Sequence, residues 1–295
     1  MSKKMVNIRY KLLFQNNSKP FLRWPGGKRW LIPILKKELQ EMPINKYIEP
    51  FLGGGAVFFS INKIPSILSD INEELVNTYI QIRDNPNGVV KELKTKPINK
   101  EYYNHVRRSK PKSRISQAVR FLYLNRTSFS GLYRLNKEGH FNVPYGGGKR
   151  TTGVLWRDGL INCAAKALEN VRIICSDFEK VIDIASKGDF VYCDPTYTVK
   201  HNNNGFRRYN EQIFSWEDQK RLAICCQKAV ERGATVVVSN AYHKEIRQIY
   251  PSFKAHEVKR LSLLSAMPQY RSNVKEYLLI GINPKNHLPI QDHFK

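Results

Sequence analysis

Residues 46–63 read KYIEPFLGGGAVFFSINK. The run KYIEPF predicts a short buried strand, the glycines Gly53 to Gly55 predict a tight turn, and AVFFSINK over 56–63 predicts a helix. A strand, a glycine turn and a helix in this order open a βαβ unit. This stretch therefore favours an α/β fold.

The sequence on both sides continues the alternation of helices and strands. Before the glycine turn, apolar residues at helical spacing from Trp30 to Leu39 predict a helix over about 27–40. After it, SILSD (66–70) predicts a strand that ends in Asp70, and NEELVNTYIQIRD (72–84) predicts a helix.

The same alternation returns in the second half of the chain. One further helix is predicted over DQKRLAICCQKAVERG (218–233). Further strands are predicted over VRIIC (171–175), DFVYCD (189–194), ATVVVSN (234–240), EVKRLSLLS (257–265) and KEYLLIGI (275–282), the last two as an antiparallel edge pair. The predicted fold class is α/β, with a doubly wound, mostly parallel sheet.

The stretch over 94–155 interrupts this pattern. It is basic, aromatic and rich in glycine, and LYRLNKEGHFNV (132–143) predicts two short strands around an NKEG turn, which is a β-hairpin. We therefore expect residues 94–155 to form an inserted module. The segments 1–93 and 156–295 are expected to form one α/β domain.

The charge of the chain points to a polyanionic partner. Its 295 residues include 49 Lys and Arg against 25 Asp and Glu, a formal net charge of +24. Nucleic acid is the commonest counter-surface for such an excess, and a membrane surface is the rival. No run approaches the roughly 18 apolar residues of a spanning helix. The five cysteines form no CxxC pair, so we expect reduced thiols, no zinc site and a cytoplasmic protein.

The glycine turn and Asp70 together favour a nucleoside ligand. A dinucleotide fingerprint would need glycine at the position of Phe58, which disfavours a pyrophosphate cofactor. Asp70, at the end of the next strand, is placed to accept both hydroxyls of a ribose. S-adenosylmethionine is such a ligand, and an ordinary tight turn is the alternative.

The segment DFVYCDPTY (189–197) delivers Asp194, Pro195, Thr196 and Tyr197 to the carboxyl end of a strand. The pattern [DNS]-P-P-[YFW] at this place resembles the signature of methyltransferases that act on amino nitrogens. Further motifs occur in one order: FLRWPGGK (21–28), YIEPFLGGGAVFF (47–59), SDINEELVNTY (69–79), FLYLNR (121–126) and GLYRLNKEGHFNVPYG (131–146). Over most of residues 20–280 the chain resembles the DNA adenine-N6 methyltransferases of the Dam family, alpha group.

The resemblance implies an S-adenosylmethionine-dependent methyltransferase fold that needs no metal. It implies that Asp194 and the Pro195 carbonyl accept the two hydrogens of the adenine amine while Tyr197 stacks on the base. The implied cofactor-binding residues are Trp24, Lys28, Pro50, Gly53, Gly55, Asp70, Asp177, Phe178 and Asp194. For Phe178 a role in the core is the alternative.

The resemblance also implies how duplex DNA is read. The module over 94–155 becomes a helical and β-hairpin target-recognition domain, and the adenine is flipped out of the duplex. The implied DNA-binding residues are Arg107, Arg108, Arg126, Phe129, Leu132 and Arg134. Phe129 would wedge into the duplex and Arg134 would read a guanine, which makes GATC the leading target. For the basic cluster around Arg107 and Arg108, the alternative to a phosphate-binding site is an ordinary solvated loop.

The sequence departs from the family pattern where Arg23, Ser130 and Thr196 replace Lys, Asn and Pro, and more mildly where Phe129 replaces Tyr. Two alternatives to DNA methylation stay open. One is a methyltransferase for RNA or for a protein amide, and the other is an inactive DNA-binding relative. Besides duplex DNA, we consider a restriction endonuclease acting separately as a partner. The expected state is a monomer, in a prokaryote or a phage.

Overall fold

The computed structural model describes residues 18–24, 26–39, 44–61, 64–136, 138–148, 152–156, 159–197, 214–261 and 273–283. The chain divides into two compact units. The first comprises residues 1–43, 53–64 and 70–175, and the second comprises 44–52, 65–69 and 176–295. Each unit is assembled from separate stretches of the chain and is described by itself.

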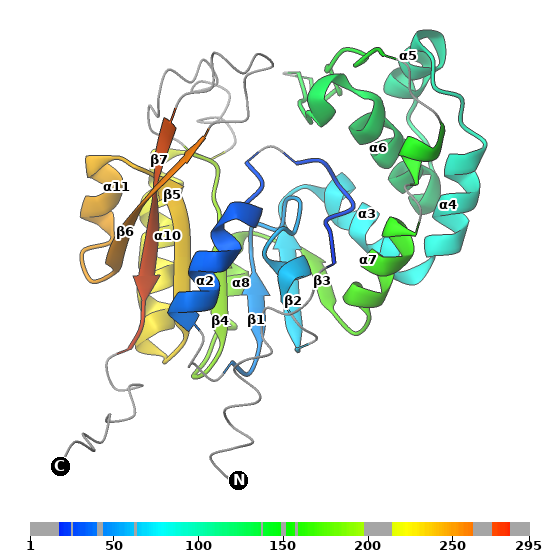
Figure 1. Cartoon of the computed structure of the whole chain (residues 1–295). Helices are drawn as coiled ribbons and strands as arrows, with labels where there is room; N and C mark the ends of the chain where they lie inside the picture. The colour runs from blue at the N-terminus through cyan, green and yellow to red at the C-terminus, as the bar shows by residue number, and fades with distance from the viewer. Residues whose placement is uncertain are drawn as a thin grey trace, which may run out of the picture. The chain divides into compact units, whose positions relative to one another are not determined.

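The second unit is built on a mixed β-sheet. Its described strands lie in the order β2-β1-β4-β5-β7-β6 (Figure 1). Their bounds are β1 Tyr47–Glu49, β2 Ser66–Asp70, β4 Phe190–Cys193, β5 Thr235–Ala241, β6 Lys254–Leu261 and β7 Asn273–Gly281. The pairs β2–β1, β1–β4 and β4–β5 are parallel, whereas β7 runs antiparallel to both β5 and β6. The predicted α/β class, with a mostly parallel sheet and an antiparallel pair, is confirmed.

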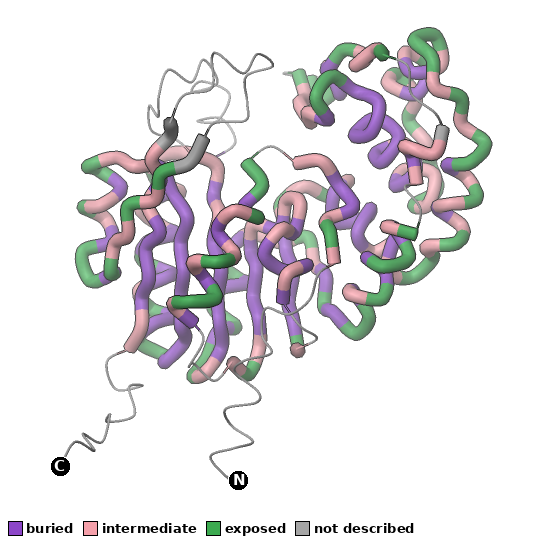
Figure 2. Tube along the Cα trace, in the orientation of Figure 1, coloured by how far each residue is buried: buried purple, intermediate pink, exposed green. Residues whose placement is uncertain are grey.

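The register of the parallel strands fixes where their last residues lie. Ile48 of β1 is opposite Ile67 of β2 and Val191 of β4, and Val191 is opposite Val236 of β5. These strands are buried along most of their length (Figure 2), as expected for parallel strands rich in branched apolar residues. Because parallel strands end at the same edge of a sheet, the residues that follow them share that edge.

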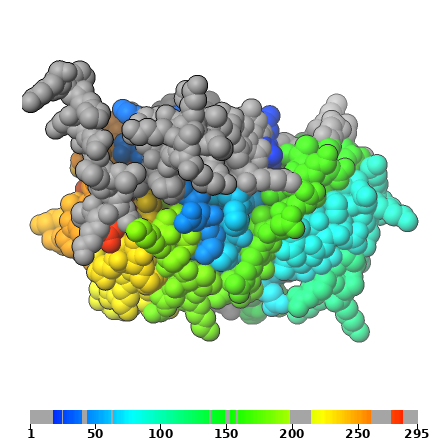
Figure 3. All heavy atoms as spheres, turned by 90° about the horizontal axis from the view of Figure 1, so that it is seen from below, coloured from blue at the N-terminus to red at the C-terminus, as the bar shows by residue number. Residues whose placement is uncertain are grey.

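The helices of the second unit are α8 Phe178–Ile182, α10 Trp216–Glu231 and α11 Lys244–Ile249. Helix α10 begins at a capping box, in which Ser215 and Asp218 each bond the other's backbone N–H. It packs on β5, β7 and α8 through buried residues such as Leu222 and Cys226. Part of its outer side reaches the surface in Figure 3, in yellow. The prediction of a helix over 218–233 is confirmed.

The first unit is mainly helical. Its elements are η1 Arg29–Leu31, α2 Ile32–Leu39, η2 Phe58–Ser60, α3 Glu73–Asp84, α4 Pro86–Lys94, α5 Lys100–Arg108, α6 Arg114–Thr127, η3 Phe129–Gly131, η4 Thr152–Leu155, α7 Leu160–Leu168 and β3 Arg172–Cys175. Helix α3 packs on α6, α7 and β3, and α4 packs on α6. The helices predicted over 27–40 and 72–84 are confirmed, apart from Gln40, which lies outside the described residues.

Two predicted elements differ from the structure. Instead of a helix over 56–63, the described part of this segment forms one 3₁₀ turn, η2, with Asn62 and Lys63 outside the described residues. The N–H groups of Ser60 and Ile61 donate to the carbonyls of Val57 and Phe58, three residues back, and Ile61 is extended, so the helix ends after one tight turn. The predicted β-hairpin pairs only through isolated antiparallel bridges, Leu135 with Phe141 and Ser128 with Tyr145.

Candidate active site and recognition hairpin

The glycine turn after β1 is shaped by a close approach of Trp24. Gly53 and Gly55 have φ values of +46° and +64°, a region that side-chain-bearing residues rarely adopt. A Cβ on Gly53 would lie 2.8 Å from Nε1 of Trp24, and one on Gly55 would lie 2.9 Å from the hydroxyl of Tyr79. That hydroxyl also donates to the Gly53 carbonyl at 3.0 Å. Only glycine therefore fits at positions 53 and 55, because a Cβ atom at either would clash with Trp24 or Tyr79.

Asp70 ties this turn to the end of β2. Its Oδ2 accepts the N–H of Gly53 at 3.0 Å, and its Oδ1 accepts the N–H of Asn72 at 3.0 Å. A carboxylate has about four lone-pair sites, so each oxygen can still accept a further hydroxyl. Burial raises the pKa of the Asp70 carboxyl, although the bonds from Gly53 and Asn72 oppose this shift. Ile71, which follows, is 68% exposed.

The raised pKa of Asp70 makes a prediction about stability. A carboxyl whose folded pKa exceeds its unfolded value binds more protons when folded, so stability falls as the pH rises from the unfolded pKa of about 4 through the folded pKa. Asp70→Asn removes this titration. The free energy of unfolding of the wild type minus that of the variant should therefore decrease between pH 4 and neutrality in urea titrations. A constant or increasing difference would contradict it.

On the second unit, Asp194 and Tyr197 are held by a buried polar network. The Ser239 hydroxyl donates to Oδ1 of Asp194 at 3.0 Å, and the Tyr197 hydroxyl donates to Oε2 of Glu276 at 2.8 Å. The hydroxyls of Tyr197 and Ser239 are 3.5 Å apart. Ser239 lies on β5, Glu276 lies on β7, and each is 1% exposed. The network fixes a carboxylate and an aromatic ring beside the carboxyl end of β4.

The peptide between Pro195 and Tyr197 has a further support. The side-chain amide of Gln219, on α10, donates to the Thr196 carbonyl at 3.2 Å. Asn240 donates in turn to the side-chain oxygen of Gln219 at 2.9 Å, and both side chains are fully buried. Where the family pattern has a second proline to stiffen this loop, Thr196 is held by a buried pair of amides.

The hairpin of residues 128–145, which the sequence predicts to read DNA and which is called the recognition hairpin below, presents polar and aromatic groups from the first unit. Phe129 is 48% exposed, which is unusual for a phenylalanine. Ser130 follows it with φ +54°, a conformation that asparagine tolerates better than serine does. Leu132 and Arg134 are half-buried. The Arg134 Nε donates to Oδ1 of Asn142 at 2.8 Å.

Comparison with known proteins identifies the family of the chain. Residues 24–263 match the model of the D12 class N6 adenine-specific DNA methyltransferases. The chain belongs to this family. It is 35% identical over 273 residues to the type II methyltransferase M1.LlaDCHI of Lactococcus lactis subsp. cremoris, with 89% of this chain and 95% of that protein covered.

Two further relatives support the assignment. The type II methyltransferase M.MjaIII of Methanocaldococcus jannaschii is 34% identical over 287 residues, covering 89% of this chain and 98% of that protein. A DNA adenine methylase of Haemophilus influenzae is 35% identical over 272 residues, covering 89% and 93%. This chain is an adenine-specific DNA methyltransferase, and methyl transfer in this family implies S-adenosylmethionine as the donor.

The remaining N-terminal residues of the methyltransferase's predicted site are placed as follows. Trp24 stacks on Tyr133, with ring centroids 5.7 Å apart and planes at 24°. Lys28 is only 4% exposed, and a lysine is rarely so buried without partners for its ammonium group. Pro50 is buried directly after β1. Trp24 and the glycine turn are thus brought together within the first unit.

Asp177 and Phe178 are both engaged by Arg221, which sequence reasoning missed. Asp177 caps α8 and receives two bonds from the Arg221 guanidinium, each 2.9 Å long. The same guanidinium lies 4.3 Å from the centroid of the Phe178 ring. That ring also stacks on Phe51 at 5.4 Å, so its environment favours the core role that the sequence left open.

The burial of Arg126 contradicts its predicted role as a DNA-binding residue of the methyltransferase. Its side chain is 1% exposed and donates to the backbone carbonyl of Phe21. A guanidinium so buried cannot reach a phosphate, so Arg126 holds the N-terminal segment in place. By contrast, Arg108 is exposed and Arg107 is half-buried at the end of α5.

Ser239, Glu276 and Gln219 were also missed. The signal available for Ser239 and Glu276 was a polar residue next to an apolar run of a strand, VVV in TVVVSNA and YLLI in NVKEYLLIG. Gln219 gave no signal, because a glutamine on a helix is ordinary.

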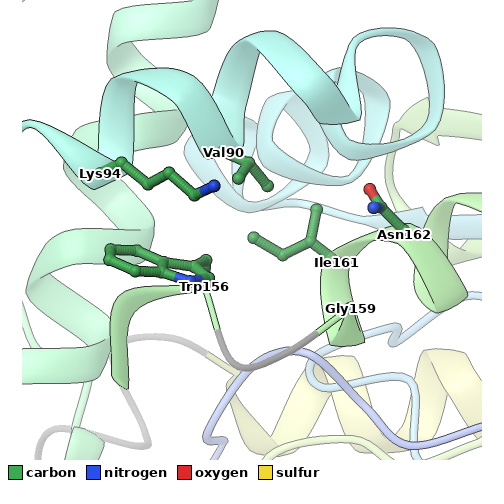
Figure 4. A pocket seen from close by; sticks show the side chains of 6 residues that line it. All are labelled: Val90, Lys94, Trp156, Gly159, Ile161 and Asn162. Atoms are coloured by element: carbon green, nitrogen blue, oxygen red, sulfur yellow. The ribbon is translucent and has the colours of Figure 1, made fainter. Parts of the chain in front are cut away.

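A separate cavity of about 250 Å³ lies in the first unit, lined by Val90, Lys94, Trp156, Gly159, Ile161 and Asn162 (Figure 4). The Lys94 ammonium lies 5.8 Å from the centroid of the Trp156 ring. None of its lining residues was predicted as a site residue.

Within the described ranges, no group of acidic, histidine or cysteine side chains is arranged for a metal ion. Among the described helices, none is long and apolar enough to cross a membrane.

Proposed function

We propose that this methyltransferase modifies the N6 amino group of adenine within GATC in duplex DNA, after flipping the base out of the helix. The observation that carries the proposal is the fixed Asp194–Tyr197 segment. A carboxylate bonded to Ser239 and a tyrosine bonded to Glu276 stand beside the end of β4, where ligands of α/β sheets bind. We take the sheet to be the doubly wound fold of S-adenosylmethionine-dependent methyltransferases.

The glycine turn is proposed to hold the methyl donor. The donor supplies an electrophilic methyl group on a sulfonium. The oxygens of Asp70 accept its ribose hydroxyls with the lone pairs that Gly53 and Asn72 leave free, and Ile71 provides an exposed apolar surface beside them. Trp24 and Gly55 shape the turn, and Lys28 pairs with the donor's carboxylate. Contributions from Pro50, Asp177, Phe178 and Asp194 stay predictions.

The residues of the DPTY segment are proposed to activate the adenine amine. The lone pair of this amine is delocalised into the ring, which makes it a poor nucleophile. The Asp194 carboxylate and the Pro195 carbonyl accept its two hydrogens and favour a pyramidal nitrogen, while Tyr197 stacks on the base. Asp194 stabilises the positive charge that develops on the nitrogen while the nitrogen–carbon bond forms and the sulfur–carbon bond of the donor breaks to leave a neutral thioether, and the extra proton then passes to solvent.

The recognition hairpin and α5 are proposed to bind the duplex. Flipping a base costs a few kcal/mol, which protein contacts must offset. The exposed Phe129 ring fills the gap in the base stack, with Leu132 beside it. Arg107 and Arg108 contact phosphates. Arg134 supplies two N–H groups to a guanine, the pairing that supports GATC.

Substitutions of Arg134 and Arg108 should have different effects, the first on sequence discrimination and the second on overall DNA affinity. We expect Arg134→Ala to lower discrimination at one guanine by about 1 to 3 kcal/mol, because it removes a bidentate base contact. Arg108→Ala should weaken binding to every duplex alike and lower its salt dependence, because it removes a phosphate contact. Methylation rates and binding on cognate and scrambled duplexes measure both. Equal losses on the two duplexes from Arg134→Ala would refute its assigned role.

The test of the function is to incubate the full chain with isotopically labelled S-adenosylmethionine and duplexes with or without GATC. The modified nucleoside is then identified by mass spectrometry, with Asp194→Ala as the control. N6-methyladenine in the GATC duplex alone is the expected result. Label in both duplexes would reject GATC and keep the chemistry. Label only in added RNA or protein would favour the corresponding alternative substrate.

The cellular role is proposed on the same basis. Relatives named type II methyltransferases support a partner restriction endonuclease that acts separately on the same sequence. We expect the enzyme to work in the cytoplasm as a monomer, because one recognition hairpin and one DPTY segment are sufficient for one adenine.

A further inference from the structure

Arg134 is held in the recognition hairpin by an asparagine on the returning segment. Leu135 pairs with Phe141, and the Asn142 N–H donates to the Arg134 carbonyl at 3.0 Å, so residues 134 and 142 lie opposite each other. Their side chains also meet, because Nε of Arg134 donates to Oδ1 of Asn142 at 2.8 Å. The arginine is thus attached to its partner by both backbone and side chain.

The position of Asn142 is itself well fixed. Its neighbours Phe141 and Val143 are buried, and the Val143 carbonyl accepts the Tyr103 hydroxyl at 2.7 Å. Phe141 packs edge-on against Tyr133, with ring centroids 5.8 Å apart. A side chain between two anchored neighbours has little freedom, so its amide oxygen is a rigid acceptor for Arg134.

The chemistry of this contact leaves the arginine able to read a base. A guanidinium offers five N–H groups in a planar fork, and an acceptor at Nε leaves both terminal nitrogens to form a bidentate pair. The acceptor is also neutral. Arg120 and Arg221, by contrast, bond carboxylates, Glu74 in the first case and Asp177 in the second, which neutralise their charge. Asn142 orients Arg134 without neutralising it.

We infer that Asn142 is a positioning residue that sets the specificity of this methyltransferase for one guanine, by presenting the terminal nitrogens of Arg134 to it. The inference rests on the proposed function and deepens it. Without the amide oxygen, Arg134 keeps its charge but samples other rotamers. Discrimination at that guanine should then fall while contacts to other bases and to phosphates persist.

The experiment compares the full chain and its variants on a library of duplexes with randomised sequence around adenine, with N6-methyladenine read by sequencing. We expect the wild type to require guanine at one position that Arg134→Ala no longer requires. Asn142→Ala should reduce the preference at that same position by about tenfold and leave the other positions unchanged. Asn142→Asp keeps an oxygen at the same place and should retain the preference, although its charge lowers the overall rate.

A second asparagine in the same hairpin provides the control. Asn136 accepts the N–H groups of Glu138 and His140 in the turn and is structural. Asn136→Ala should lower activity on all sequences without a positional change. If Asn136→Ala relaxes the same position as Asn142→Ala does, or if Asn142→Ala leaves the motif intact, the inference is overturned. A wild type that methylates no DNA would instead reject the proposed function.

Discussion

Replacing Asp194 with alanine is expected to lower the rate of methyl transfer by about 10³-fold, the scale on which enzymes lose activity when a pre-organised polar group at the reacting centre is removed. The carboxylate is half-buried and fixed by Ser239, so its bonds to the amine need little reorganisation during the reaction. Alanine offers no acceptor for the amine and no negative charge opposite the nitrogen. Single-turnover rates at saturating DNA and methyl donor measure this loss.

Ser239→Ala is the matched control for Asp194→Ala. It leaves the carboxylate in place and removes the 3.0 Å bond that orients it, together with the 3.5 Å contact between the Ser239 and Tyr197 hydroxyls. We expect a loss of about tenfold, the scale of one hydrogen bond of about 1.5 kcal/mol to a charged group. If Asp194→Ala costs no more than Ser239→Ala, the carboxylate does not act at the reacting nitrogen.

Replacing Gly53 with alanine is expected to raise the dissociation constant for S-adenosylmethionine by about 100-fold, equivalent to about 2.7 kcal/mol. At φ +46° alanine is strained, and its Cβ would lie 2.8 Å from the Trp24 indole nitrogen. Either the turn or Trp24 must move, and the Gly53 N–H bond to Asp70 moves with the turn. Isothermal titration with the donor measures affinity, and urea unfolding measures the accompanying loss of stability.

Gly159→Ala is the control that separates the effect of backbone strain at a positive φ from the effect of the clash with Trp24. Gly159 has φ +77°, and an added Cβ there meets no atom within 4 Å. This variant should lose about 1 kcal/mol of stability and keep its affinity for the methyl donor. If Gly53→Ala and Gly159→Ala bind the donor equally well, Gly53 has no part in the cofactor site.

The strands and the ends of the strands were predictable from the sequence because both depend on local patterns. TVVVSNA and FVYC are short branched runs, which are typical of buried parallel strands. A strand followed by Asp194 must place that carboxylate at the edge of the sheet. The glycine turn was predictable for the same reason, since only glycine allows a positive φ at low cost.

The contacts that fix those residues were not predictable, because they join positions far apart in the chain. Asp194 and Ser239 are 45 residues apart, and Tyr197 and Glu276 are 79 apart. The error at Arg126 has the same origin. A motif shows which residue occurs at a position, whereas burial against Phe21 depends on a segment 105 residues away. The helix expected over 56–63 was wrong because the chain makes one tight turn, with Ser60 and Ile61 bonded to carbonyls three residues back, and is then extended at Ile61.

The place of β7 in the sheet makes the setting of Tyr197 depend on the last described strand of the chain. β7 is the last described strand in the sequence, yet it inserts between β5 and β6, which the ribosome releases earlier. Glu276, which holds the Tyr197 hydroxyl, arrives on that same strand. A nascent chain that stops short of residue 276 therefore leaves the edge of β5 open and its tyrosine unanchored. The Asp194–Tyr197 segment therefore reaches the geometry described above only after β7 has been synthesised and has joined the sheet.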